Sequence, residues 1–387
     1  MKIAIIGSGP AGGMAGIQAL NNGHEIVFFD EKQPLSTLLP TGGGRCNLTY
    51  AEFDNKELIN FYPRGGKFLL SVFAQFSTGD TIEFFDKIGV PTYIQEDFRI
   101  FPTSNSSKDV QVKMLDKLNS KKVRYIREKI YKIEQKTSGF KVHTKLNSYD
   151  YEKIIFAGGI KNNYDLLKTL GIKLIEPKPA LCAICCDEKD IYELSGLSFK
   201  NICATLPNKK QLFGDFLITH SSLSGPLAYK ISSVYAYEKF PYKILLNFIG
   251  LSAEEFDKKL IEDLNINSKK DVINIIAEYV PRSFAKYLLR KNNLKEDLKA
   301  NQVSKVNRVM LVQQLTNYNL NIISQKADGE IVTAGGVDLD YVNAKTMEYK
   351  EIKGLYFCGE VLNIDGFTGG FNLQNCWSTG YIAGKSI

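Results

Sequence analysis

The chain has 387 residues, 44% of them hydrophobic, which allows two or three domains with their own cores and excludes a disordered chain. Its net charge of +7 suits a polyanionic partner such as RNA, but a lysine-rich proteome gives the same charge, and this plainer explanation is favoured. No apolar run approaches the roughly 18 residues of a membrane-spanning helix, and the opening strand leaves no room for a signal peptide. We therefore expect a cytoplasmic protein without a membrane segment.

A β–turn–α–β unit opens the chain. The apolar run Lys2–Ile6 is typical of a buried strand, and Gly7–Gly12 (GSGPAG) follows it as a G-x-G-x-x-G motif. A helix is predicted over Gly13–Asn22, then a second buried strand over Ile26–Phe29, which leads to Asp30. This order of strand, glycine turn, helix, strand and acid predicts a dinucleotide site rather than an ordinary glycine-rich turn.

The glycine motif has a specific part in binding a dinucleotide. Gly7 allows the tight turn, Gly9 lets backbone N–H groups approach a pyrophosphate, and Gly12 lets the helix pack closely on the strand. The start of the helix, with Pro10 and Ala11, presents N–H groups and a partial positive charge to the phosphates.

The acid after the second strand indicates which nucleotide binds. Asp30 would accept a hydrogen bond from a ribose hydroxyl, with Glu31 as the second candidate. A 2′-phosphate would be repelled there, so the sequence predicts FAD or NAD rather than NADP.

A second glycine-rich segment follows at Thr41–Thr49 (TGGGRCNLT). A flexible surface loop has this composition too, but the position directly after the nucleotide-binding unit favours a loop that lies flat against a planar ligand. The residues expected to face that ligand are Gly43, Gly44, Arg45, Cys46 and Asn47.

The chain then returns to the sheet. Helices are predicted over Lys67–Phe76, Asp80–Ile88 and Lys108–Leu118, and strands over Arg99–Pro102, Val123–Glu134 and Gly139–Lys145. A buried strand over Lys153–Gly159 ends in a glycine turn, where Ala157 and Gly158 would pass the cofactor again.

From about Pro177 the pattern changes to short strands, which predicts a small β domain. These strands are Ala180–Cys186, Asn201–Leu206, Gln211–Thr219 and Tyr242–Phe248, with a polar turn at Thr219–Pro226 that ends in a Gly-Pro breaker. His220 in this turn is the one histidine in a plausible ligand-facing loop, although a structural histidine is slightly favoured.

No metal site is predicted. Cys182, Cys185 and Cys186 lie close together, but no further ligand pair is near them, and the run is typical of a buried strand.

A helical segment over Ser252–Asn319 begins with a capping box and is interpreted as an insert in the β domain. A solvated face is favoured over a nucleic-acid surface for its basic residues, which are Arg282, Lys286, Lys291, Lys295, Lys299 and Lys305.

The C-terminal part of the chain contains several segments that are predicted to contact the cofactor. Strand-like residues at Leu320–Ser324 and Glu330–Thr333 are followed by a buried strand over Gly354–Glu360. A glycine-rich turn at Asp365–Asn375 then leads to a helix over Asn372–Lys385, whose start would direct N–H groups at an electronegative ring edge.

Several of these runs together resemble one family, the BaiN/RdsA-type flavoproteins, also described as aminoacetone oxidase family FAD-binding enzymes. The resemblance spans nearly the whole chain and rests on TGGGRCNLT, LITHSSLSGP, VTAGGV, GLYFCGEVLNIDG and TGGFNLQ. Two departures stand out: Ser36-Thr37 replaces the Arg-Lys that relatives carry before the triple glycine, and the turn after Gly159 is short.

The resemblance implies an α/β fold, with a Rossmann-like FAD-binding domain of the two-dinucleotide-binding-domain flavoprotein type. The expected domains are 1–178 with 334–387 for FAD, 179–250 with 319–333 as a β-barrel-like domain, and 251–318 as the helical insert. The resemblance also places Gly359 and Glu360 near the ribityl–phosphate part, and Gly369, Gly370, Phe371, Asn372 and Leu373 near the isoalloxazine.

The implied activity is a reductase that passes hydride from NAD(P)H, a transient donor, through flavin N5 to a conjugated C=C bond of a small molecule or RNA. Cys46, His220 or a tyrosine would give the proton. The alternatives are a dihydrouridine synthase acting on 23S ribosomal RNA, an oxidase of aminoacetone, and a non-enzymatic, redox-sensing flavoprotein. Because no second G-x-G-x-x-G occurs, NAD(P)H would react without a domain of its own.

Overall fold

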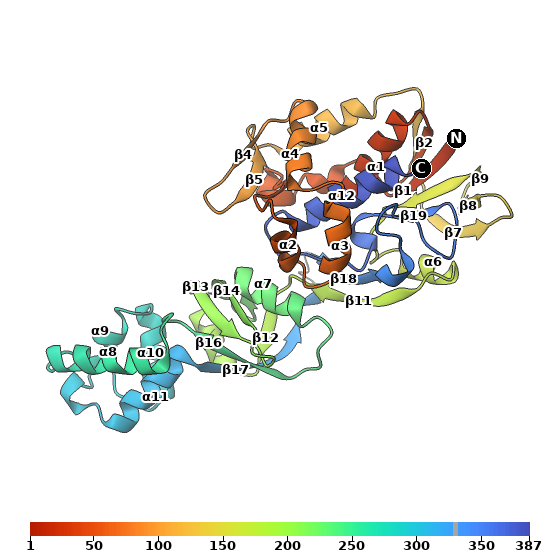
Figure 1. Ribbon diagram of the computed structural model, residues 1–387. Helices are drawn as coiled ribbons and strands as arrows, with labels where there is room; N and C mark the ends of the chain where they lie inside the picture. The colour runs from red at the N-terminus through yellow and green to blue at the C-terminus, as the bar shows by residue number, and fades with distance from the viewer. Residues whose placement is uncertain (328–331) are drawn as a thin grey trace. The chain divides into compact units, whose positions relative to one another are not determined.

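The computed structural model describes residues 1–327 and 332–387, which form two compact units (Figure 1). Unit 1 comprises Met1–Lys178 and Thr333–Ile387, and unit 2 comprises Pro179–Val332. The strand predicted over Glu330–Thr333 falls partly on residues 328–331, which lie outside the described residues. Within the described ranges, no helix has both the length and the apolar character needed to cross a membrane.

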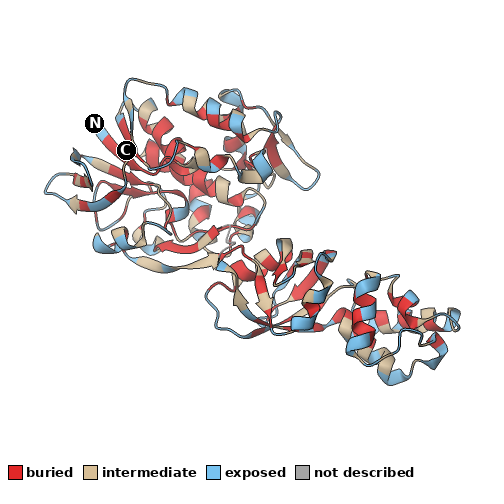
Figure 2. Ribbon diagram, turned by 180° about the vertical axis from the view of Figure 1, so that it is seen from behind, coloured by how far each residue is buried: buried red, intermediate tan, exposed pale blue. Residues whose placement is uncertain are grey.

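A five-stranded parallel sheet in the order β19-β10-β1-β2-β6 forms the centre of unit 1. Its strands are β1 (Lys2–Ile6), β2 (Glu25–Phe29), β6 (Val123–Ile126), β10 (Lys153–Phe156) and β19 (Leu355–Phe357). Apart from their first residues, β1, β2 and β10 are buried, and β19 is buried throughout (Figure 2), as expected for a parallel sheet covered on both faces. β1 lies between β2 and β10, so the carboxyl ends of β1 and β10 form the switch point where ligands bind in such folds.

Helices and smaller sheets complete unit 1. The helices are α1 (Pro10–Asn21), α2 (Asn55–Leu58), α3 (Gly66–Phe73), α4 (Thr78–Lys87), α5 (Ser107–Lys117), α6 (Tyr164–Thr169) and α12 (Phe371–Lys385). The smaller sheets are β3 (Thr49–Tyr50) with β5 (Arg99–Pro102) and β4 (Thr92–Ile94), then β7 (Ile130–Gln135) with β8 (Phe140–Thr144) and β9 (Ser148–Tyr151), and β11 (Leu174–Ala180) with β18 (Val332–Val337).

The strand predicted over Val123–Glu134 is wrong in one respect. It is two strands, β6 and β7, separated by the polar residues Arg127–Lys129. Only β6 joins the central sheet, whereas β7 pairs with β8 in a separate antiparallel sheet.

Helices α1 and α12 pack side by side at very short range (Figure 1). A Cβ on Gly380 would lie 2.5 Å from the carbonyl oxygen of Ala11, and one on Gly384 would lie 2.2 Å from that of Ala15. This order of contacts makes the two helices parallel. Helix α12 begins nine residues before Gly380, which lies beside Ala11. At 1.5 Å per residue, the first residue of α12 therefore lies about 14 Å from Ala11 along the helix axis, on the N-terminal side.

Unit 2 contains a closed barrel in the order β12-β15-β14-β13-β16-β17, which confirms the predicted β-barrel-like domain. Its strands are β12 (Ile184–Cys186), β13 (Ser198–Thr205), β14 (Gln211–Ile218), β15 (Leu223–Ser224), β16 (Tyr242–Asn247) and β17 (Tyr318–Gln325).

Two sequence predictions in this barrel are wrong. The strand expected over Ala180–Cys186 is interrupted, because Leu181 has a left-handed backbone with φ of 47° between the end of β11 and the start of β12. The Gly-Pro pair expected to break the chain instead opens helix α7 (Gly225–Val234), since proline is well tolerated in the first helical turn.

The predicted helical insert is present as α8 (Ala253–Ile266), α9 (Val272–Ile276), α10 (Arg282–Lys291) and α11 (Lys305–Thr316). Its capping box is confirmed: Glu255 N–H donates to Ser252 Oγ at 3.2 Å, and Ser252 N–H donates to the Glu255 carboxylate at 2.9 Å.

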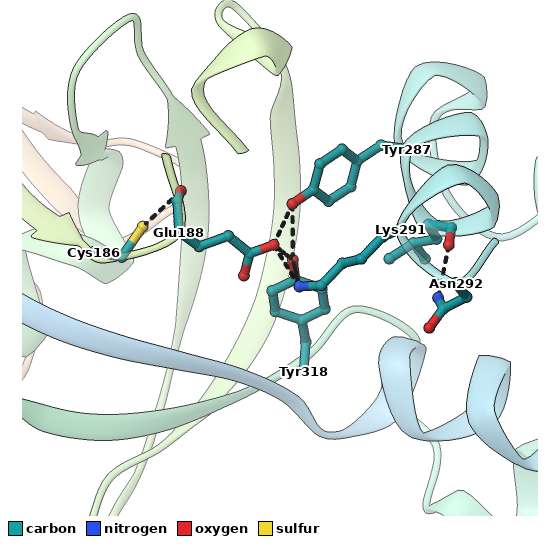
Figure 3. Close-up of polar contacts among 7 residues, drawn as sticks. Cys186, Glu188, Tyr287, Lys291, Asn292 and Tyr318 are labelled. Atoms are coloured by element: carbon teal, nitrogen blue, oxygen red, sulfur yellow. Dashed lines mark hydrogen bonds and ion pairs between the residues drawn. The ribbon is translucent and has the colours of Figure 1, made fainter. Parts of the chain in front are cut away.

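One acid links the insert to the barrel (Figure 3). The Glu188 carboxylate accepts hydrogen bonds from Tyr287 and Lys291 of α10 and, at 2.6 Å, from the Tyr318 hydroxyl of β17. Burial first, and then the hydrogen bond to Glu188, raises the pKa of both tyrosines, so each stays protonated as a donor. One carboxylate with donors from α10 and β17 therefore holds α10 against the barrel.

The α1–α12 contact gives a first prediction. In Gly384→Ala the new methyl group would collide with the Ala15 carbonyl, and overpacking of this kind lowers the free energy of unfolding by about 1–3 kcal/mol. The matched control is Gly79→Ala in α4, where the nearest atom is Ser77 Oγ at 3.8 Å. The control is expected to be neutral or to stabilise by up to about 1 kcal/mol, because alanine favours helix. Urea unfolding of the two variants gives the comparison, and equal effects would contradict the proposed crowding.

Candidate functional site

The glycine turn after β1 is built around close backbone packing. Gly7 has φ of +95°, and a Cβ there would lie 2.6 Å from Gly158 Cα. A Cβ on Gly12 would lie 2.0 Å from the Gly7 carbonyl oxygen. Gly9, in contrast, has only Thr37 Oγ1 within reach, at 3.3 Å from such a Cβ, so its backbone is open where α1 begins.

Asp30 lies beside this turn at the end of β2. Its carboxylate accepts hydrogen bonds from Ser8 N–H at 2.7 Å and Ser8 Oγ at 2.8 Å, and from Lys32 N–H at 2.9 Å. The carboxylate is thus held next to the glycine turn, as the sequence predicts for a ribose ligand. Glu31, the second candidate, is exposed.

The ends of β10 and β19 reach the same edge of the sheet. Ala157 N–H donates to the Ile6 carbonyl at 2.7 Å, so the turn at Ala157 and Gly158 runs alongside the glycine motif. Gly359 packs against Ala11, where an added Cβ would lie 2.6 Å from the alanine Cβ.

Glu360 is the titratable group of this edge. The residue is exposed at one side, but its carboxyl group lies close to many protein atoms and is partly withdrawn from water. This desolvation, and then the nearby Asp365 carboxylate, raises the pKa of Glu360 above its usual value. Asp365 itself is fully buried and forms an ion pair with Arg64.

The start of α12 is fixed by several contacts. Gly370 precedes it with φ of +101°, and a Cβ there would lie 2.6 Å from the Thr49 carbonyl group. The Asn372 side chain accepts from Gly366 N–H at 2.8 Å and donates to the Gly366 carbonyl at 2.9 Å. The first N–H groups of the helix have no acceptor within it and point away from its start. They belong to Phe371, Asn372 and Leu373, with Gly369 and Gly370 as the preceding turn.

The triple-glycine segment is a short 3₁₀ turn, Thr41–Gly44, with left-handed φ values at Gly42 and Gly43. Added Cβ atoms would meet nothing within 4 Å at Gly43 and only the Leu39 carbonyl at Gly44, so this backbone is open. Arg45 lies over the ring of Phe101 at 4.1 Å from its centroid.

Cys46 differs from the expected ligand-facing side chain. It is fully buried, and burial raises the pKa of its thiol to about 12. Its neighbour Asn47 is nearly buried, and the Asn47 Oδ1 atom has no hydrogen-bond partner among the described residues.

These residues fit FAD. The open backbone at Gly9, Gly43 and Gly44 is a surface that side chains would fill, and Asn47 offers a buried carbonyl oxygen for a polar ligand group. The Asp30 carboxylate, held beside the glycine turn by Ser8, would be available to a ribose hydroxyl. The two helix starts, about 12 Å apart along their axes, suit an extended ligand that is anionic at one place and electronegative at another.

The remaining sequence candidate, His220, belongs to unit 2. It is exposed on the turn closed by the bond from Thr219 N–H to the Ser222 carbonyl at 2.9 Å. Among the residues that the structure describes, no cluster of His, Cys, Asp or Glu could hold a metal ion.

Sequence reasoning missed an aromatic group beside the start of α12. Tyr50, Phe61 and Phe371 have ring centroids 4.5–5.2 Å apart, and Phe98 lies 6.2 Å from Tyr50. The positions of these four residues in the sequence follow neither a helical nor an alternating spacing. Only the tertiary structure brings them together.

Comparison with known proteins gives a match to one family model, described as HI0933-like protein Rossmann domain, over residues 1–386. The chain is 27% identical to the 3-dehydro-bile acid delta(4,6)-reductase of Clostridium scindens, over 100% of this chain and 98% of that protein. It is 25% identical to the ribosomal RNA dihydrouridine synthase of Escherichia coli, over 99% of this chain and 97% of that protein.

Solved structures give a more distant likeness. A flavocytochrome c3 fumarate reductase in its open conformation is 14% identical, covers 100% of this chain and 77% of its own, and has a TM-score of 0.49.

The burial of Cys46 gives a second prediction. With a pKa of about 12, only about one Cys46 thiol in ten thousand is ionised at pH 8, so the native protein should not react there with a disulfide reagent such as DTNB. Cys185, which is only partly buried, is the internal control and should react first. Rapid labelling of Cys46 in the folded protein would contradict the burial.

The raised pKa of Cys46 also makes the free energy of unfolding depend on pH. The unfolded thiol loses its proton near pH 8.5 and the folded one only near 12, so the unfolded state binds fewer protons between these values. The contribution of Cys46 to the free energy of unfolding is therefore full below about pH 8 and is lost as the pH rises. Cys46→Ala should flatten this decline in urea unfolding measured between pH 8 and 10, and an unchanged slope would contradict the assignment.

Proposed function

The chain belongs to the HI0933-like family of Rossmann-domain proteins, and on this premise we propose that it is an FAD-dependent oxidoreductase. The observation that carries the proposal is the convergence of four segments at one edge of the central sheet. These segments are Gly7–Gly12, Asp30, Ala157–Gly158 and Gly359–Glu360, joined by the start of α12.

The residues would hold FAD in two regions. Gly9 and the start of α1 would bind the pyrophosphate through backbone N–H groups, and Asp30 would accept from the adenosine ribose. Glu360 would lie near the ribityl–phosphate part, with its raised pKa favouring a hydrogen bond over an isolated charge. The N–H groups of Asn372 and Leu373, with the open turn at Gly43, would face the ring.

When bound, FAD would supply hydride chemistry at N5, which we propose connects NAD(P)H to a conjugated C=C bond. The protein would stabilise negative charge at the ring edge through the helix start. It would also supply a proton to the neighbouring carbon. Cys46 is a poor acid for this step, because its thiol is fully buried and burial raises its pKa to about 12.

Ribosomal RNA dihydrouridine synthesis is the second candidate function. The names of the Escherichia coli and Haemophilus influenzae relatives, 25% and 26% identical, favour it. The insert adds little support, because Lys286, Lys291 and Lys299 are each paired with a carboxylate. Deleting the gene and mapping dihydrouridine in 23S ribosomal RNA decides this candidate; an unchanged modification pattern would exclude it.

The proposed cofactor is tested by Gly9→Val. An added Cβ at Gly9 would have only Thr37 Oγ1 within 4 Å, at 3.3 Å, and the rest of a valine side chain would extend into the space that we assign to the pyrophosphate. The variant should have the same melting temperature as the original protein when both are free of FAD, yet it should co-purify with less than about a tenth of the FAD, a loss of about 1.4 kcal/mol in binding. Gly79→Ala is the control that should retain FAD. Full FAD content in Gly9→Val would contradict the assigned pyrophosphate site.

The proposed reaction is tested by anaerobic mixing of the yellow protein with NADPH or NADH. Loss of the oxidised flavin absorbance is expected with at least one of them. No bleaching with either would contradict the donor, and hydrogen peroxide release with aminoacetone would instead identify the oxidase.

A further inference from the structure

Phe98 occupies an unusual place in the protein. It is the last residue of the loop between β4 and β5, where Phe98 N–H donates to the Gln95 carbonyl at 2.9 Å and Gln95 N–H donates to the Arg99 carbonyl at 2.8 Å. Its φ is +65°, in the left-handed region where hairpin loops of this kind usually have glycine or asparagine. A bulky aromatic residue at such a position is disfavoured for the fold.

Burial does not account for this phenylalanine. Its side chain is 57% exposed, so it adds little to any core. The strained backbone is instead held in place from outside the loop, because Ala51 N–H donates to the Phe98 carbonyl at 2.7 Å. Strain that the surrounding structure maintains without a gain in packing is characteristic of a functional position.

The exposed ring continues an aromatic group that reaches the proposed flavin site. Phe98 lies 6.2 Å from Tyr50, whose ring is 4.8 Å from that of Phe371, the first residue of α12. Phe61 stacks on Phe371 at 4.5 Å with an interplanar angle of 11°. Phe371 is buried, whereas Tyr50 and Phe61 are partly exposed, so three rings offer accessible surface next to the helix start.

The charges around these rings are acidic. Burial, and then the carboxylates of Asp97 and Glu52, raises the pKa of Tyr50. The nearby Arg99 is neutralised by its ion pair with Asp97, at 2.6 Å. This pair is neutral overall, so Glu52 leaves a slight acidic excess, which offers no attraction to an RNA phosphate and does not oppose an uncharged ligand.

We propose that Tyr50, Phe61 and Phe98 form a stacking platform that binds a flat, uncharged, conjugated small molecule as the substrate at the flavin. The inference rests on the proposed function and adds to it the residues that select the substrate. The Tyr50 ring is tilted by 49° from Phe61 and by 52° from Phe98, so a flat conjugated ligand would stack on one ring and meet the others with its edge. Phe98 keeps its strained backbone because the exposed ring serves the ligand rather than the fold.

The test separates ligand binding from stability with Phe98→Gly and the matched control Phe98→Tyr. FAD-loaded protein is reduced photochemically without NAD(P)H and mixed anaerobically with menadione, a flat uncharged quinone, to obtain an apparent Kd from the saturation of reoxidation. In Phe98→Gly this Kd should rise about three- to tenfold, whereas Phe98→Tyr should stay within about twofold of the original protein. Ferricyanide, which is charged and not flat, should reoxidise the original protein, Phe98→Gly and Phe98→Tyr at the same rate.

A second readout needs no activity. The melting temperature of Phe98→Gly without FAD should be unchanged or higher, because glycine relieves the left-handed strain. A lower melting temperature would show that the ring holds the hairpin and would overturn the proposal. The proposal would also be overturned if the reoxidation rate of the original protein did not saturate with menadione concentration. Equal Kd values for the original protein and Phe98→Gly would overturn it as well.

A short uridine-containing RNA tests the competing ligand. It should not displace menadione, and displacement lost in Phe98→Gly would show that the platform serves an anionic polymer, against the proposal. Absence of FAD from the original protein would overturn the proposed function itself, whereas FAD present with unaltered Kd values would overturn the platform alone.

Discussion

The contact between α1 and α12 is the constraint on which the site depends. Gly380 and Gly384 have no side chains, so α12 rests directly on the carbonyl groups of Ala11 and Ala15. The contact joins two segments more than 350 residues apart in the sequence and sets how far apart the two helix starts lie. One start then faces the glycine turn of β1, and the other faces the aromatic group around Tyr50. The separation between an anchoring end and a reacting end is therefore a property of helix packing and not of any loop.

The sequence predicts those parts of the protein that depend on local backbone rules. Gly7 and Gly12 are glycines because neighbouring backbone leaves no room for a Cβ, and such a requirement leaves a motif with fixed spacing. The buried strands and the capping box at Ser252 follow equally local patterns. Local patterns do not predict the barrel, because its closure depends on pairing between strands that are distant in the sequence. The barrel is predicted through the resemblance to a family.

The parts that sequence reasoning missed are set by tertiary contacts. Cys46 lies in a loop with polar neighbours, and nothing in the sequence shows that its thiol is fully enclosed. Helix α7 begins where a Gly-Pro pair is usually a break, because Gly225 takes a left-handed φ of +87° and Pro226 then suits the first turn. Phe98 gives no signal either, since its backbone conformation comes from the loop and from the bond to Ala51.

The two ends of the site carry different information. Backbone N–H groups and one carboxylate, Asp30, would make up the proposed anchoring end, and such groups recognise a nucleotide whatever the reaction. Relatives named for a bile acid and for ribosomal RNA cover nearly this whole chain at 27% and 25% identity, so fold and anchor alone cannot decide between substrates. We assign the choice to side chains near the start of α12, where Tyr50 is partly exposed and Phe98 is exposed, close to the carboxylates of Glu52 and Asp97. An uncharged flat substrate satisfies that surface without placing phosphates beside Glu52 and Asp97.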